Sequence, residues 1–178
     1  VQNCWMSNVV VEIYGGDNPQ VELYWSYRTL IEHCTFVGYN NRASAIVSAH
    51  HRSGTRIQNN IFSNCYQAII TKGRSSSDAF VYNYTPTVTN STSAFISEAG
   101  SHGTHTKYEL WEGYVGFSID LDSIHGSGHK KHLYNCYLLG EVPGYTTFGY
   151  GAVKIDSFNP WCSVVNCVLG YSGMSGWA

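Results

Sequence analysis

The chain has 178 residues, a net charge of −2 and only 12% charged residues, about half the usual share. This length suffices for one domain with a hydrophobic core. The composition argues against a disordered chain and against a nucleic-acid-binding protein, and no apolar run reaches the roughly 18 residues that span a bilayer.

The chain is rich in Tyr, Trp and Gly, with 14, 5 and 18 residues respectively. Together with the low charge, this composition is typical of extracellular β proteins, so we expect a location outside the cell or on a cell or virion surface. The six cysteines form no CxxC pair, which leaves no zinc-type spacing. The sequence begins at Val1 inside a repeat and without a signal peptide, so we expect a fragment that lacks its natural caps.

One six-residue phrase recurs along the chain. It consists of an aliphatic residue, any residue, a polar residue that is usually Asn, a ladder position, any residue and an apolar residue. The copies are VQNCWM (1–6), IEHCTF (31–36), IQNNIF (57–62), VYNYTP (81–86), LWEGYV (110–115), LYNCYL (133–138) and VVNCVL (164–169). Their starts are separated by 23 to 31 residues, which favours a β-solenoid with constant strands and variable turns.

A second short pattern follows most of the phrases. It is β-branched and partly alternating, and it predicts strands. It reads AIVSAH (45–50), AIITKG (68–73), AFISEA (94–99), FSIDLD (117–122) and AVKIDS (152–157). Because stacked coils pair parallel strands about 4.8 Å apart, seven coils would make a rod roughly 34 Å long.

These phrases resemble those of the right-handed parallel β-helix proteins of the pectate-lyase-like superfamily, in which I-x-N-N-x-F phrases recur once per coil and an Asn ladder stacks inside a turn. The stretches VYNY (81–84), LWEGYVG (110–116) and DSIHGSG (122–128) resemble its uncharacterised bacterial and phage-like branch. The resemblance implies an all-β fold, with one right-handed parallel β-helix over residues 1–178. It also implies a polysaccharide or another glycan as the partner. The superfamily hosts lyases, hydrolases, adhesins and phage tailspikes, so the fold alone does not define the function.

The ladder position predicts a column of stacked side chains. We expect its thiols to fill a tight turn as small hydrophobic groups; a redox or metal column and a disulfide between Cys136 and Cys167 are the alternatives. The predicted column is Cys4, Cys34, Asn60, Tyr84, Gly113, Cys136 and Cys167.

The strand after each phrase is the predicted substrate face, since the enzymes of this superfamily bind substrate along a strand face. Because side chains along a strand alternate between the two faces, we expect Asp120 and Lys154 to point outward. The same alternation predicts an outward column of five ionisable residues on successive coils. Carboxyl groups roughly 6.5–9.5 Å apart suit inverting glycoside hydrolysis, and stacked like charges raise the pKa of one of them. A solvated polar face is the alternative. The predicted column is His50, Lys72, Glu98, Asp122 and Asp156.

Histidines form a second predicted cluster, because His102 and His125 follow strands of adjacent coils. One interpretation is a metal site or a general base beside the Asp residues, and the other is turn residues that bond backbone groups. The same alternatives apply to His105, His129 and His132. We predict Asp120, Asp122, Glu98 and His125 as catalytic. We predict that substrate is bound by His50, Lys72, His102, Lys154 and Asp156.

No metal is assigned from the sequence. Calcium is one candidate, because the pectate lyases that the chain resembles use an Asp-rich calcium site with an Arg base. The candidate face offers no such Arg, and the Asp-Asp and Gly-His-Gly motifs of polygalacturonases are absent.

Three functions follow as hypotheses. The first is an extracellular polysaccharide hydrolase or lyase. The second is a non-catalytic glycan-binding or adhesion module, such as part of a tailspike or surface fibre. The third is a structural rod. A trimer or end-to-end stacking through open strand edges would be the corresponding homo-oligomers.

Overall fold

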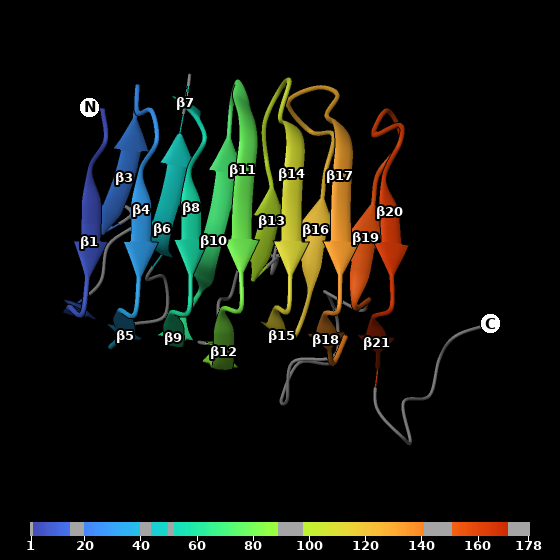
Figure 1. Ribbon diagram of the computed structural model, residues 1–178. Helices are drawn as coiled ribbons and strands as arrows, with labels where there is room; N and C mark the ends of the chain where they lie inside the picture. The colour runs from blue at the N-terminus through green and yellow to red at the C-terminus, as the bar shows by residue number, and fades with distance from the viewer. Residues whose placement is uncertain are drawn as a thin grey trace.

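The chain winds repeatedly through three parallel sheets, and successive coils stack side by side along one axis (Figure 1). The computed structural model describes residues 2–14, 20–39, 44–49, 52–88, 98–140 and 151–170. Neighbouring strands within a sheet are mostly three elements apart in sequence, which is the order of a β-solenoid with about seven coils. The predicted all-β solenoid is confirmed.

Each coil visits the sheets in a fixed order. Sheet 1 contains β1 (Trp5–Ser7), β4 (Leu30–Glu32), β8 (Arg56–Gln58), β11 (Ser75–Val81), β14 (Lys107–Glu112), β17 (His129–Tyr134) and β20 (Ser163–Val165), with β7 (Arg52–Ser53) also paired to β11. Sheet 2 contains β2 (Val10–Ile13), β5 (Thr35–Gly38), β9 (Ile61–Cys65), β12 (Tyr84–Val88), β15 (Val115–Gly116), β18 (Tyr137–Leu138) and β21 (Val168–Leu169). Sheet 3 contains β3 (Val21–Tyr24), β6 (Ser44–Ala49), β10 (Gln67–Lys72), β13 (Ala99–Ser101), β16 (Ile119–Leu121) and β19 (Val153–Ile155).

The repeated phrase begins in sheet 1 and ends in sheet 2. The register pairs Met6 with Ile31, and it pairs Phe80 with both Ile57 and Trp111. The first copy therefore starts at residue 6 rather than 1, and the fourth and fifth start one residue away from the predicted positions. Packing of aromatic rings supports this register, since the centroids of Phe80 and Trp111 lie 4.1 Å apart in the core with the rings tilted by 33°.

The ladder prediction is accordingly wrong for Cys4, Tyr84 and Gly113 and correct at the other four positions. Cys136 and Cys167 stack without a disulfide, and all six cysteines are free thiols. Burial raises the pKa of Cys65 and of Cys136 to about 12, so these two thiols act as small apolar groups rather than as nucleophiles. The observed ladder is Val9, Cys34, Asn60, Asn83, Tyr114, Cys136 and Cys167.

The polar position of the phrase bends the backbone. The residue there has a φ of 52–60° in every coil, a left-handed conformation that Asn and Gly adopt at least cost. His33 is therefore a turn residue, and its neighbour Cys34 stacks inside the turn. The seven turn residues are Asn8, His33, Asn59, Tyr82, Gly113, Asn135 and Asn166.

A second turn, between sheets 3 and 1, encloses charged side chains in the interior of the solenoid. The guanidinium of Arg52 lies 3.3 Å from the Asp78 carboxylate, and both side chains are fully buried. Ser101 donates a 2.5 Å hydrogen bond to Glu109, and Lys131 donates to Asn159 at 3.1 Å. The interior of the solenoid thus has an apolar part and a polar seam along this corner.

The Asn part of the ladder satisfies backbone groups of neighbouring coils. Asn60 accepts a 2.9 Å hydrogen bond from the Cys34 amide and donates to the Ile31 carbonyl at 3.1 Å. Asn83 repeats the arrangement one coil further on, accepting from the Asn60 amide and donating to the Ile57 carbonyl. Each Asn therefore connects adjacent coils through groups that are shielded from water.

We expect Asn60→Ala to lower the free energy of unfolding by about 2–4 kcal/mol, because it leaves a buried amide and a buried carbonyl without partners. Chemical denaturation measures this change. The exposed neighbour Asn59 supplies the control: Asn59→Gly keeps the left-handed turn and should change stability by less than about 0.5 kcal/mol. Equal effects of the two substitutions would contradict the ladder's role.

Candidate functional site

The outward residues at the ends of the sheet 3 strands form one column across adjacent coils. Register places Asp120 beside Lys154, and it places Lys72, His102, Asp122 and Asp156 at equivalent positions. The column is therefore confirmed at Lys72, Asp122 and Asp156. His50 lies outside the described residues, and Ala49 of β6 pairs with Lys72.

Glu98 does not belong to this column, so its predicted outward position is wrong. The strand in this coil is β13, whose small residues carry no alternating pattern, and His102 takes the position expected for Glu98. The Glu98 side chain is fully buried and accepts hydrogen bonds from the Tyr114 hydroxyl and from the amides of Phe117 and Ser118. It cannot contact a substrate bound outside the solenoid.

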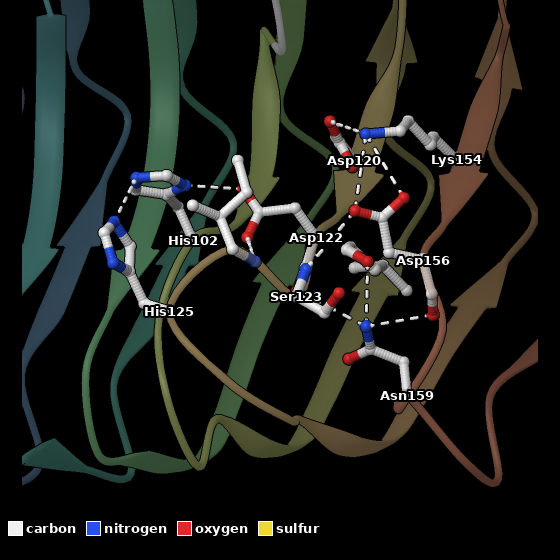
Figure 2. Close-up of polar contacts among 10 residues, drawn as sticks. His102, Asp120, Asp122, Ser123, His125, Lys154, Asp156 and Asn159 are labelled. Atoms are coloured by element: carbon white, nitrogen blue, oxygen red, sulfur yellow. Dashed lines mark hydrogen bonds and ion pairs between the residues drawn. The ribbon is translucent and has the colours of Figure 1, made fainter.

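His102 is held by a carboxylate of the next coil. Its Nδ1 lies 2.5 Å from Asp122 Oδ2, and Asp122 Oδ1 accepts a 3.2 Å hydrogen bond from the Ile124 amide (Figure 2). Burial acts to raise the pKa of Asp122, but the hydrogen bond from His102, together with the Ile124 amide and the Lys154 charge, outweighs it and holds that pKa below its usual value. Since an ionised carboxylate only accepts, Nδ1 of His102 carries the proton.

His125 completes a chain of three side chains. Its Nε2 faces Nε2 of His102 at 3.0 Å, and the two rings meet edge to face (Figure 2). With the proton of His102 on Nδ1, its Nε2 accepts from His125, and Nδ1 of His125 is then left as a basic nitrogen on an exposed side chain. The predicted meeting of His102 and His125 is confirmed.

An open pocket of about 480 Å³ lies beside this chain. It is lined by Lys72, Gly73, His102, Gly103, Thr104 and His125. Gly103 packs so closely on the Gly73 backbone of the preceding coil that no Cβ would fit there. The pocket thus places Lys72, His102 and His125 beside the closely packed turns at Gly73 and Gly103.

A second polar cluster adjoins the first on β16 and β19. The Lys154 ammonium lies 3.5 Å from Asp120 and 3.2 Å from Asp156, and the Ser123 amide donates to Asp156 at 3.4 Å (Figure 2). Burial raises the pKa of Asp120 to about 6, although the Lys154 charge partly offsets it. Asp120 is thus more readily protonated than Asp122, whose pKa is lowered, so the two carboxyls have different acidities.

The described residues contain no group of three or more His, Cys, Asp or Glu side chains arranged to hold a metal ion. Asp120 and Asp156 are the acidic pair that could be considered for calcium, but the Lys154 ammonium lies between them and pairs with both. Nε2 of His102 and of His125 are the closest pair of potential nitrogen ligands in the candidate site.

Comparisons of the chain with protein-family models, with curated proteins and with solved structures gave no match. Within the part of the chain that the structure describes, no helix is long and apolar enough to cross a membrane.

Sequence reasoning missed the pocket residues Gly73, Gly103 and Thr104. A signal was present, because TKG (71–73) and SHG (101–103) end the sheet 3 strands of adjacent coils with a glycine at the same place. The other predicted turn histidines lie elsewhere: His132 bonds Ser163 at 2.7 Å, and His129 packs near Tyr108.

The buried carboxyl of Glu98 generates a pH prediction. Burial raises its pKa from 4.5 to about 7, although four hydrogen bonds act to lower it. The protonated form therefore stabilises the fold below pH 4.5, and that contribution is lost as the pH rises through about 7. Relative to the native chain, Glu98→Gln should gain up to about 3 kcal/mol of unfolding free energy between about pH 5 and about pH 8.

Denaturant titrations at several pH values measure this difference. Glu112→Gln, a change at a partly exposed carboxylate on β14, is the matched control and should leave the pH profile unchanged. If the difference in unfolding free energy between Glu98→Gln and the native chain stays constant with pH, the buried carboxyl is not protonated at neutral pH.

Proposed function

We propose that this protein is an extracellular, polysaccharide-active parallel β-helix related to the pectate-lyase-like superfamily. Its site is suited to proton abstraction from an acidic sugar. The observation that supports the proposal is the chain from Asp122 through His102 to His125 at the rim of a pocket that also contains Lys72. A carboxylate that orients a histidine increases its basicity and fixes its tautomer, which is what a general base requires.

The roles follow from the order of the hydrogen bonds. His125, the exposed end of the chain, is the base through Nδ1, and it takes the proton from the carbon beside a sugar carboxylate. His102 and Asp122 position that ring and stabilise the imidazolium that forms. Lys72 neutralises the sugar carboxylate, on which negative charge accumulates as the proton leaves.

The reaction that uses these groups is β-elimination. The electron pair of the broken C–H bond forms a carbon–carbon double bond, and the glycosidic C–O bond to the departing sugar breaks. The leaving oxygen is protonated by water or by the imidazolium, so the products are an unsaturated sugar end and a new hydroxyl. No oxidant or reductant is needed.

Hydrolysis is the alternative, and the unequal acidities of Asp120 and Asp122 favour it. Both carboxylates have other partners, however: Asp120 pairs with Lys154, and Asp122 is held by His102 and by a backbone amide. We therefore rank elimination first. A non-catalytic glycan-binding module would use the same pocket without turnover.

A panel of uronate-containing and neutral polysaccharides, assayed for unsaturated products and for new reducing ends, tests the proposal. We expect unsaturated products from an acidic polysaccharide, and His125→Gln should lower kcat by about 10²–10⁴-fold. Asp122→Asn should lower kcat comparably with a smaller effect on KM, because an amide favours the wrong tautomer of His102.

The exposed His105, which is not among the pocket residues, supplies the matched control, and His105→Gln should retain full activity. Reducing ends without unsaturated product would indicate hydrolysis. Glycan binding without any product would support the binding-module function. Turnover that persists in His125→Gln would rule out the assigned base.

A further inference from the structure

A basic and aromatic patch lies on the corner between sheets 3 and 1 in the last three coils. We call it the corner patch; it comprises Lys107, Tyr108, His129, Lys130 and Trp161. Figure 1 shows the strands that these residues begin or precede, β14, β17 and β20, side by side. The Lys130 ammonium lies over the rings of Tyr108 and Trp161, 4.9 and 5.8 Å from their centroids, and donates to the Tyr108 hydroxyl at 3.2 Å.

The backbone turns these side chains outward. Tyr108, Lys130 and Trp161 occupy the same left-handed turn position in successive coils, with φ values of 54°, 56° and 58°. Tyr108 and Trp161 are 48% and 71% exposed, large fractions for rings with no apolar cover. The two rings are two coils apart, about 10 Å by the spacing of parallel strands, with a lysine between them.

The corner patch is locally positive in a chain of net negative charge. The segments 105–108, 127–130 and 158–161 contain no Asp or Glu, and Glu109 at the next position is fully buried. The pKa values of two side chains in the corner patch reflect this positive charge. Partial burial and the nearby lysines lower the pKa of His129, and the hydrogen bond and charge of Lys130 lower that of Tyr108.

The corner patch is close to the pocket along the chain. Lys107 is three positions after the pocket residue Thr104, and His129 is four positions after His125. Three residues of extended chain span at most about 11 Å, so a ligand only a few sugars long would reach from one to the other.

We propose that the corner patch binds an anionic stretch of polysaccharide that continues beyond the pocket, with the two rings stacking on sugar faces and the two lysines pairing with carboxylate or sulfate groups. The identity of the ligand as a carbohydrate rests on the proposed function. The shape and charge of the corner patch are independent of the proposed function. A nucleic acid is disfavoured, since the chain has a pI of about 6.4 and nucleic-acid-binding domains commonly exceed pI 9.

Calorimetric titration of the full chain with polygalacturonate, chondroitin sulfate, neutral dextran and single-stranded DNA tests this inference. We expect binding to one or both acidic polysaccharides, weakened by salt, and none to dextran. Trp161→Asn, Tyr108→Asn and Lys130→Asn should each weaken that binding about 3–10-fold, and Asn is compatible with the left-handed backbone at these positions. A response to only one of the two polysaccharides identifies carboxylate or sulfate as the recognised group.

Matched controls lie on two other strands of sheet 1, β1 and β8. Trp5→Ala removes an equally exposed indole and Arg56→Gln removes an exposed cation, and both should bind as the native chain does. Equal affinity for dextran, tighter binding of DNA than of either polysaccharide, no binding to any acidic polysaccharide, or native affinity in the three patch variants would each overturn the inference.

The His125→Gln variant separates this inference from the proposed function. It should lose turnover and keep native affinity for the acidic polysaccharide. A chain that binds through the corner patch but cleaves no polysaccharide would refute the function and support the patch. If the native chain cleaves acidic polysaccharide but the patch variants bind it with native affinity, the proposed function is supported and the corner patch is refuted.

Discussion

The hydrogen bonding of each strand to the same strand of the neighbouring coil is the constraint on which the whole structure depends. It holds equivalent residues about 4.8 Å apart, so every feature of one coil is repeated as a column. A column must satisfy the same steric and polar requirements in each coil. This explains why the first turn has a left-handed residue at all seven positions, and why Asn60 and Asn83 serve neighbouring backbones in the same way.

The same stacking creates the candidate site. His102 follows β13 and Asp122 follows β16, so pairing of these two strands brings a histidine and a carboxylate together although they are 20 positions apart in sequence. His125 comes from the turn that follows and closes onto His102. The functional groups thus lie where regular strands give way to turns, on a rigid support that fixes their spacing.

A residue's position could be predicted from the sequence only where its segment specified a single register. Strand β16 and the residue after it alternate Ile and Leu with Asp, so the directions of Asp120 and Asp122 away from the core were predictable, although Asp122 is only 6% exposed. Strand β13 reads AGS and offers no alternation, and the Gly100 backbone approaches Asp120 too closely for a side chain. Glu98 was therefore assigned to the surface when it is buried, and His102 was not recognised as its replacement in the column.

The amino-acid sequence alone was enough to predict the period of the coils, the turn residue in four of the seven coils and most of the strands that carry charge, because these depend on local preferences repeated in each coil. Only the tertiary structure decided which side chains meet. A shift of one residue in a strand exchanges its inward and outward faces, and apolar residues such as Phe80 and Val81 made two registers look equally good. Packing between coils stabilises one of these registers. In that register Arg52, Asp78 and Glu98 are buried. The same register brings His102, Asp122 and His125 together.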